Sequence, residues 1–357
     1  MSNMLNEALE SADIVAAQLA DTSRIEALAD KLKEQPRHVA LTIARGSSDH
    51  AASYFASLTM SRIGVPVASL PMSVATLQQA PLRVSGQLAV AFSQSGKSPD
   101  LVGTMQALRE AGAFTVAAVN VTGSPLETHV NTFLPLLAGP ELSVAATKSY
   151  IAMLSLSAIV IAHVQRDVEL LNALKSLPDA LRAAGKLDWT RAVKELTNVD
   201  RMIVIGRGLG LAIAQEAALK LKETSGIQAE AFSSAEVRHG PMEIIDQDYP
   251  LLVFAPRGPE QVGLIQLASR YARARRSRTA RRAIGRAGSR TAARRNRSSG
   301  ARSDRRNPFV LCDGRESGPR ARAQSRRAAS PEQGHRNPLS EKADAPCQGV
   351  SVKSSHR

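Results

Sequence analysis

Apolar residues recur at helical spacing along the first 35 residues of the chain. The leucines and isoleucines that form this pattern are Leu5, Leu9, Ile14, Leu19, Ile25, Leu28 and Leu32. Asp21-Thr22-Ser23 interrupts them with residues that favour helix N-caps. The pattern therefore predicts two helices within residues 1–34, ahead of the main fold.

Short apolar runs alternate with helical patterns from residue 38 onward. The runs at 38–44 and 88–92 each end in a turn that opens a helix, a third run follows at 114–119, and a further helix is expected at 148–164. Strands that alternate with helices predict an α/β fold with a parallel, doubly wound sheet. Ligands of such sheets bind at the carboxyl ends of the strands, so we expect the site there.

The strand and turn at 41–46 (LTIARG) recur at 201–208 (RMIVIGRG), and a helix again follows. This internal duplication predicts two similar αβα domains. We expect the first at 35–178 and the second at 196–268, joined by a polar linker at 179–195. The second domain is expected to be incomplete, because its apolar pattern disappears at about residue 269.

Charge divides the chain at the same place. Residues 1–269 carry 22 Lys and Arg against 26 Asp and Glu, a net of −4, whereas residues 270–357 carry 24 against 6, a net of +18. The first part is aliphatic and mildly acidic, as soluble enzymes are. The tail at 269–357 is rich in Arg, Ser and Ala, and we expect it to be disordered or out of frame.

Cysteine usage and the lack of targeting signals indicate the compartment. Both cysteines, Cys312 and Cys347, lie in the tail, so no disulfide can form within the first part. The N-terminus has no apolar leader, and no run approaches the roughly 20 apolar residues of a membrane span. We expect a cytoplasmic protein that does not cross a membrane.

A serine-rich turn follows the strand at 88–92. Residues 93–100 (SQSGKSPD) place three hydroxyls and a glycine between a buried strand and a helix start. Hydroxyls and backbone N–H groups at such a helix end can bind a phosphate. The segment predicts an anion site, and the alternative is a turn whose Ser and Asp only cap the helix.

The equivalent turn of the first strand, residues 46–50 (GSSDH), is a weaker candidate. Gly46 permits a tight turn and Ser48 would face the same crevice. His50 is interpreted as a helix-start or interface residue, because no second His or Cys lies at metal-ligand spacing.

The helix at 216–223 (EAALKLKE) places Glu216, Lys220 and Glu223 on one face. Surface ion pairs also produce this pattern. A long loop is expected at 229–242 and could return His239 to the sheet edge. A carboxylate beside a lysine, with a histidine available, suits proton transfer next to a carbonyl.

In chain order, six blocks carry a family resemblance: ARGSSDH, SQSGKSPD, AGPELSVAATKSY, GRG, EAALKLKE and AEAFSSAEVRHGPM. They resemble the double sugar isomerase (SIS) domain family. They look like the isomerase half of glucosamine-6-phosphate synthase, and closer still like the stand-alone glucosamine-6-phosphate deaminases of the same fold. The resemblance covers about residues 30–268.

The resemblance implies a role for each matching residue. The residues that would hold the phosphate are Ser93, Gln94, Ser95 and Ser98, and those that would touch the sugar are Ser48 and the backbone of Val144. The proton shuttle between C1 and C2 falls on Glu223, with Lys220 beside it. Ring opening falls on His239, which in the family comes from the neighbouring subunit. A sugar-phosphate substrate and a homodimer are therefore implied, without metal or organic cofactor.

The chain departs from the synthase at its N-terminus. The synthase has a glutaminase domain with a cysteine directly after the initiator methionine, whereas this chain has Ser2. Free ammonia as the nitrogen source, or the reverse deamination, is therefore expected rather than glutamine as the nitrogen source.

Our main hypothesis is an isomerase or deaminase of amino-sugar or ketose phosphates, of the glucosamine 6-phosphate/fructose 6-phosphate type. The alternative is a non-catalytic sugar-phosphate-binding protein with a nucleic-acid-contacting basic tail. No helix-turn-helix segment precedes the first domain, which argues against a regulator.

The Arg-rich tail has two interpretations. A nucleic-acid-binding arm would pair arginines with phosphates, but aromatic residues for base stacking are nearly absent, so a nucleic-acid partner is not expected. A frameshift accounts for the tail better. Codons compatible with residues 269–283, read one base later, can give AAMRARGAAVLLAAP, a helix end followed by a buried strand. The family's substrate-contacting C-terminal lysine would fall in the shifted stretch, so we expect the printed chain to fold poorly in its second domain and to have little activity.

Overall fold

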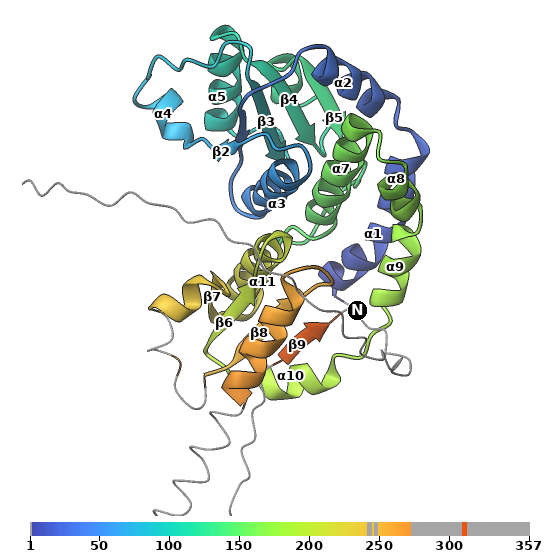
Figure 1. Cartoon of the computed structure of the whole chain (residues 1–357), viewed down its shortest axis with the longest axis vertical. Coiled ribbons are helices and arrows are strands. Elements are labelled where there is room, and N and C mark those ends of the chain that lie inside the picture. The colour runs from blue at the N-terminus through green and yellow to red at the C-terminus, as the bar shows by residue number, and fades with distance from the viewer. Residues whose placement is uncertain (1, 241–244, 246–248, 273–308, 313–357) are drawn as a thin grey trace, which may run out of the picture. The chain divides into compact units, whose positions relative to one another are not determined.

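The computed structural model describes residues 2–240, 245, 249–272 and 309–312, all within one compact unit at residues 1–313 (Figure 1). The two N-terminal helices are confirmed as α1 (Asn3–Ala20) and α2 (Ser23–Glu34). The Asp21 carboxylate accepts hydrogen bonds from the backbone N–H and hydroxyl of Ser23, which fixes the break between the two helices.

The buried face of α1 differs from the one that its leucines predict. Leu5 and Leu9 are 47% and 42% exposed, whereas Glu7 is only 4% exposed. The reason lies in the tertiary structure, because the Glu7 carboxylate points inward and accepts hydrogen bonds from backbone N–H groups of a loop that is distant in sequence. Periodicity predicted the helix correctly but not its rotation about its own axis.

The first domain contains a parallel sheet of five strands in the order β2-β1-β3-β4-β5. In chain order the strands are β1 (Ala40–Ile43), β2 (Val67–Ser69), β3 (Leu88–Ser93), β4 (Phe114–Val119) and β5 (Thr132–Pro135). Every residue of β3 is buried, as expected for a central strand that is covered on both faces. Parallel pairing of β3 with β1 and β4 brings the turns after these strands to one edge of the sheet.

Helices cover both faces of this sheet. They are α3 (Ser47–Arg62), α4 (Met72–Thr76), α5 (Pro99–Glu110), α6 (Pro125–Thr128) and α7 (Lys148–Gln165). Residues of α1, α2, α3 and α7 form one apolar cluster with the sheet, and residues of α5 and α6 form the other. The doubly wound αβα arrangement predicted from the sequence is confirmed.

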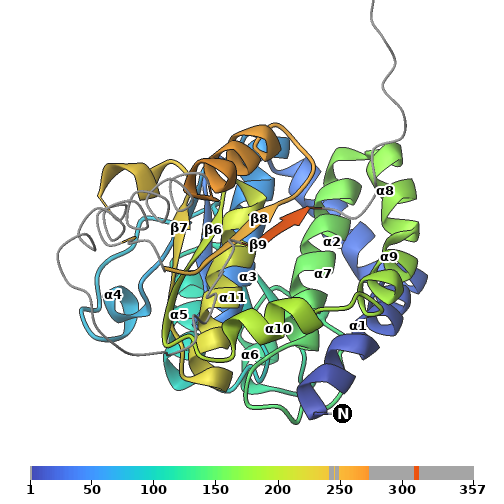
Figure 2. The ribbon, with the colours of Figure 1, turned by 90° about the horizontal axis from the view of Figure 1, so that it is seen from below.

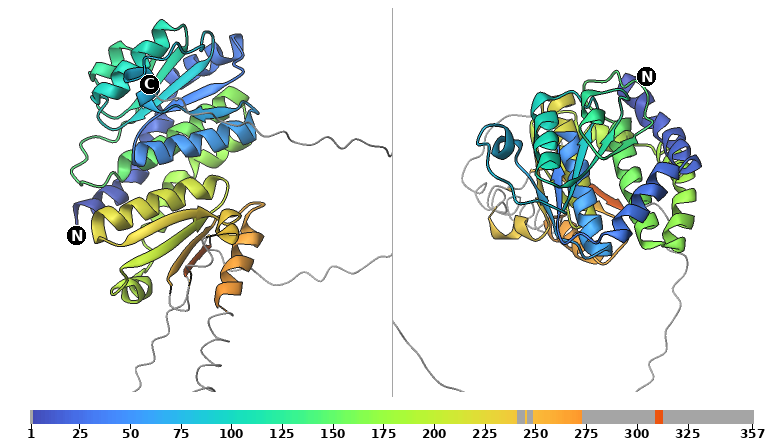
Figure 3. Two further views of the ribbon diagram at one scale, coloured as in Figure 1. Left: turned by 90° about the vertical axis from the view of Figure 1, so that its left-hand side faces the viewer. Right: turned by 90° about the horizontal axis from the view of Figure 1, so that it is seen from above.

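The second domain contains a parallel sheet whose described strands have the order β7-β6-β8-β9 (Figure 2). These strands are β6 (Arg201–Gly206), β7 (Gln228–Ser233), β8 (Leu251–Ala255) and β9 (Phe309–Cys312). Helix α11 (Leu209–Ser225) packs on one face and the helix at 261–272 on the other. The left view of Figure 3 shows α11 in yellow alongside its sheet. The described residues therefore form four strands here, one fewer than in the first domain.

The two domains repeat one topology. Strands β7-β6-β8-β9 correspond in order to β2-β1-β3-β4 of the first sheet, and α11 follows β6 as α3 follows β1. The turn that opens the helix is also repeated, because Gly46 and Gly208 both precede the helix with positive φ. A Cβ placed on Gly208 would lie 2.8 Å from Oε1 of Glu260, so this carboxylate lies against the second turn.

Two helices and one strand occupy segments that we expected to be a linker and a loop, and one further helix lies between α7 and the linker. Helices α8 (Val168–Lys175), α9 (Leu177–Ala184) and α10 (Thr190–Leu196) follow α7, so the expected linker at 179–195 is largely helical. The segment at 229–242, which we expected to be a loop, begins inside strand β7 and continues into the short helix η1 (Glu236–His239). The alternation of β7 is not evident in the sequence, because small and polar residues dominate it. The tail at 269–357, which was expected to be disordered or out of frame, contains strand β9 at 309–312 and the last residues of the helix at 261–272. The rest of the tail, residues 273–308 and 313–357, lies outside the described residues.

Candidate active site

The serine-rich turn forms a compact cradle at the carboxyl end of β3. The hydroxyl of Ser93 accepts a hydrogen bond from the N–H of Gly96 (2.9 Å), and the hydroxyl of Ser95 accepts one from the N–H of Lys97 (3.3 Å). Ser98 is the N-cap residue of α5, but its side chain makes no capping hydrogen bond. No Ser98 side chain therefore occupies the first N–H groups of this 12-residue helix, and the anion site at this position stays a prediction.

Gly96 is required by the close packing of this turn. Its φ is +63°, and an added Cβ would lie 2.4 Å from the hydroxyl of Ser124 and 2.9 Å from Cγ1 of Val119. The Ser124 hydroxyl is buried and makes no hydrogen bond with a described residue. Any side chain at position 96 would push the turn away from β4, since real Cβ atoms do not approach so closely.

The first turn of α3 faces the second domain. Ser48 is only 9% exposed, and its neighbour Ser47 accepts a hydrogen bond from Nζ of Lys220 at 3.0 Å. Helices α3 and α11 pack against each other, so this bond crosses from one domain to the other. The predicted sugar-contacting Ser48 and the predicted proton-shuttle helix are thus joined through adjacent residues.

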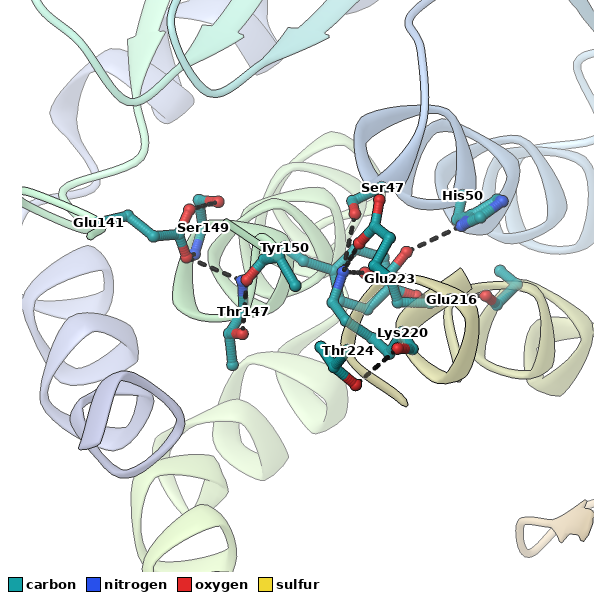
Figure 4. A network of polar contacts seen from close by, with 12 residues as sticks. Ser47, His50, Glu141, Thr147, Ser149, Tyr150, Glu216, Lys220, Glu223 and Thr224 are labelled. Carbon is teal, nitrogen blue, oxygen red and sulfur yellow. Dashed lines mark hydrogen bonds and ion pairs between the residues drawn. The ribbon is translucent and has the colours of Figure 1, made fainter. Parts of the chain in front are cut away.

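The predicted row on α11 is present as a chain of charges (Figure 4). Nζ of Lys220 lies 2.5 Å from Oε1 of Glu216 and 3.7 Å from Oε2 of Glu223. The Glu216 side chain is 7% exposed and that of Lys220 15%, whereas that of Glu223 is 37% exposed. The row is therefore not an ordinary surface ion pair. Its buried end holds the lysine, and its open end presents a carboxylate to solvent.

His50 completes the buried end of the row. Its Nδ1 lies 2.8 Å from Oε2 of Glu216, so this histidine lies at the interface between the domains, in agreement with its interpretation as an interface residue. Burial alone would raise the pKa of Glu216, but hydrogen bonds from His50 and Lys220 together hold that pKa below its ordinary value. Burial and the nearby Glu216 carboxylate both raise the pKa of the Tyr150 hydroxyl, which hydrogen-bonds to the carbonyl of Ala212 at 3.3 Å.

His239 lies at the exposed end of η1. Among the described residues, no hydrogen bond or ion pair joins it to Glu223 or Lys220. The single chain therefore brings Glu223, Lys220 and Ser48 together but leaves His239 apart. Its role in a neighbouring subunit stays a prediction.

Val144 lies on a loop that α1 anchors. Its side chain is fully exposed, while the backbone N–H groups of Leu142 and Ser143 donate to Oε1 of Glu7 at 2.5 and 3.1 Å. Glu7 was not expected to contact the site from the sequence, although Glu7, Ser11, Val15 and Gln18 form a buried polar and apolar face of α1 at helical spacing.

The same loop is fixed at its other end by Glu141. Its carboxylate accepts hydrogen bonds from the backbone N–H groups of Thr147 (2.8 Å) and Ser149 (3.1 Å) and from the hydroxyl of Ser149 (Figure 4). Glu141 therefore caps the start of α7. Lys148, only 4% exposed, pairs with Glu10 of α1 at 2.6 Å. The carboxylates of Glu7 and Glu141 thus hold this loop against α1 and α7, and that of Glu10 joins the two helices to each other.

The fold and these clustered residues define a class of protein. Comparison with known proteins identifies that class. The profile of the SIS domain family matches residues 35–162 and 195–285, more than half of the chain, and the chain belongs to this family. The second matched segment runs beyond residue 268, where we expected the domain to end.

Individual relatives are fructose-6-phosphate aminotransferases and a phosphosugar isomerase. Glutamine–fructose-6-phosphate aminotransferase [isomerizing] from Aquifex aeolicus is 34% identical over 238 residues, which is 65% of this chain and 39% of that protein. This chain thus spans about two fifths of the length of the curated relatives it matches. A candidate phosphosugar isomerase from Silicibacter pomeroyi superposes with a TM-score of 0.74 at 37% identity, covering 76% of this chain and 84% of that one. The C-terminal domain of glucosamine-fructose-6-phosphate aminotransferase from Francisella tularensis has a TM-score of 0.68 at 25% identity, covering 76% and 81%.

Two other properties bear on the class of site. Among the described residues, no group of three or more His, Cys, Asp or Glu side chains is placed to hold a metal ion. One described helix, Lys148–Gln165, is long and apolar enough to cross a membrane, but 72% of it is buried inside the protein. It is therefore interpreted as the core helix α7.

Proposed function

We propose that this chain is a sugar-phosphate isomerase or deaminase that acts on an amino-sugar or ketose phosphate by ring opening and C1/C2 proton transfer. The observation that carries the proposal is the contact between the domains. Lys220 bonds to Ser47 of α3 and lies 3.7 Å from Glu223. A half-open carboxylate is thereby held beside the helix that begins with Ser47 and carries Ser48.

The cradle supports binding of the phosphate. Ser93, Gln94, Ser95 and Ser98 would hold it at the start of α5, where helix dipole and hydroxyls favour an anion. A phosphate fixed there would fix the position of the sugar carbons, because the phosphate is attached to the far end of the same chain of carbons.

The chemistry needs one group that takes and returns a proton. The Glu223 carboxylate would remove the proton from the carbon beside the carbonyl of the open sugar and return it to the neighbouring carbon. The Lys220 ammonium would stabilise the negative charge that develops on the oxygen between these steps. His239 of a partner subunit would open the ring, so the active form would be a homodimer. The family relationship also supports a cytoplasmic location.

The four-strand second sheet favours a second candidate. The phosphate cradle lies wholly in the first domain, which has five strands, while Glu223 depends on the second, where the described residues form four. A chain with an intact first domain alone would bind sugar phosphates without turning them over. The non-catalytic sugar-phosphate-binding protein therefore remains the competing candidate.

One experiment separates the two candidates. Ammonia release from glucosamine 6-phosphate and conversion of fructose 6-phosphate are measured with the full chain and with Glu223→Gln, and binding of both sugars is measured by calorimetry. We expect Glu223→Gln to abolish turnover and to keep binding, while Glu230→Gln, an exposed glutamate on β7, keeps both. Binding without any turnover in the unaltered chain would establish the non-catalytic candidate, and full turnover in Glu223→Gln would remove Glu223 from its role.

A further inference from the structure

Glu216 is a buried carboxylate whose two oxygens contact the two domains separately. Oε2 lies 2.8 Å from Nδ1 of His50 on α3, and Oε1 lies 2.5 Å from Nζ of Lys220 on α11. No proposed catalytic step uses Glu216 or His50. A buried charge that is paired on both sides is costly to assemble, so its role in the site calls for an explanation.

The distances around Lys220 decide which carboxylate neutralises it. Its ammonium is 1.2 Å closer to Glu216 (2.5 Å) than to Glu223 (3.7 Å). The Glu216 contact is also the more buried, and attraction between charges grows as distance and exposure to water fall. The charge of Lys220 is therefore compensated mainly by Glu216. Glu223 is left with a neighbouring cation but without a close ion pair.

This arrangement matters for a general base. A carboxylate that pairs tightly with a cation loses basicity, because the cation stabilises its ionised form. We propose that Glu216, held by His50, is the counter-ion that occupies Lys220 and thereby leaves the Glu223 carboxylate without a close ion pair, so that it can accept a substrate proton. Glu216 and His50 are positioning residues in this inference, which rests on the role proposed for Glu223.

The titratable groups around Glu216 come from three helices. They are Asp49, His50 and Tyr54 on α3, Tyr150 on α7, and Lys220 and Glu223 on α11. Of the strands packed on α11, β7 carries the exposed Glu230, β8 carries no titratable residue, and Arg201 of β6 lies over the ring of Tyr249. Among these groups, Lys220 and His50 are the ones that an ion pair or hydrogen bond joins to Glu216, so its removal should affect these two side chains directly.

The test follows the titration of Glu223 itself and needs no turnover. The full chain is labelled with carbon-13 at the glutamate side-chain carboxyls, and the Glu223 signal is assigned from its loss in Glu223→Gln. In Glu216→Gln, Lys220 should turn to Glu223, and the Glu223 titration midpoint should fall by about one pH unit or more, the usual effect of a close opposite charge. Glu216→Asp, which keeps the charge, should largely restore the midpoint, and Glu230→Gln should leave it unchanged.

A second variant keeps the inference testable if Glu216→Gln does not fold. In Lys220→Met the Glu223 midpoint should rise by less than about half a pH unit, because little of the lysine's charge acts on Glu223. An unchanged midpoint in folded Glu216→Gln, or a rise of more than about half a pH unit in Lys220→Met, overturns the inference. Loss of the proposed function is separately visible, since it would appear as full turnover in Glu223→Gln.

Discussion

Gly46 and Gly208 adopt the same backbone conformation, with φ and ψ of 57° and −133° at Gly46 and 56° and −133° at Gly208. Each glycine directly precedes the helix that carries part of the site, α3 in the first domain and α11 in the second. This region of φ and ψ is open to glycine and strained for every residue with a Cβ. The duplication is therefore preserved in backbone geometry as well as in sequence pattern.

Replacing Gly46 with alanine should destabilise the first domain by about 1 to 3 kcal/mol, the cost of holding a non-glycine residue in such a conformation. The cost would be conformational only, because an added Cβ has nothing within 4 Å. Denaturant unfolding followed by circular dichroism measures it. Gly263→Ala is the matched control, since position 263 is helical with open space around it and alanine should not destabilise it. Equal stability of both variants would contradict the strain.

Replacing Gly96 with alanine should weaken phosphate binding about tenfold or more, because the added methyl overlaps Ser124 and Val119 and displaces the cradle from β4. Calorimetric titration with fructose 6-phosphate measures the loss. Gly123→Ala provides the comparison, because Gly123 also has positive φ (69°) but has nothing within 4 Å of an added Cβ. Similar affinities in the two variants would show that position 96 does not shape the anion site.

Acidification should release the loop that carries Val144. Burial alone would raise the pKa of Glu7, but hydrogen bonds from Ser143 and Leu142 and the charge of Lys148 lower it below its ordinary value of 4.5. Because the folded-state pKa is lower than that of the unfolded chain, the ionised carboxylate stabilises the fold above about pH 4.5, and this stability is lost as the pH falls through the folded-state value.

Glu7→Gln should therefore cost about 1.5 to 3 kcal/mol at pH 7, the usual value of hydrogen bonds to a charged group, and less at pH 3. Thermal unfolding of the variant and the unaltered chain at several pH values measures the difference. Asp13→Asn on the same helix is a control, because its carboxylate is exposed and pairs with Arg182 on the surface. A difference that does not shrink with falling pH would show that the charge of Glu7 is not what holds the loop.

Restoring the reading frame after residue 268 should produce a more stable and more active protein than the printed chain. The shifted reading supplies a helix end, the apolar strand AAVLLAAP and the lysine expected at the family's C-terminal end. Ammonia release from glucosamine 6-phosphate and thermal unfolding of the two proteins measure the gain. Resequencing the gene from several isolates gives an independent answer. An uninterrupted frame that encodes the printed sequence in all of them would reject the frameshift.

The sequence predicted the features that depend on local pattern. Strands β1, β3 and β4 and the turns at Gly46 and Ser93 follow from apolar runs that end in small residues. The rotation of α1 did not follow, because Glu7 is buried by a loop more than 130 residues away. Strand β7 was missed because its residues carry little apolar alternation.

In the candidate site, too, some features follow from local sequence spacing and others only from the tertiary structure. The helical row of Glu216, Lys220 and Glu223 could be read from spacing, since i, i+4 and i+7 lie on one face. That Glu216 is the buried member could not, because its burial depends on His50 in the other domain. Pairing across domains is a property of the tertiary structure, and one sequence taken by itself contains no signal for it.

The correspondence of β8 with β3 has a consequence for stoichiometry. After β3 the chain has the hydroxyl-rich turn, whereas after β8 it has Pro256, Arg257, Gly258, Pro259 and Glu260, without a single hydroxyl. The Glu260 carboxylate lies against Gly208, at the start of α11, where its negative charge suits the helix end. The two domains thus share the same scaffold, but only the first has the hydroxyl-rich turn that would bind a phosphate. Each chain should therefore bind one sugar phosphate at saturation rather than two.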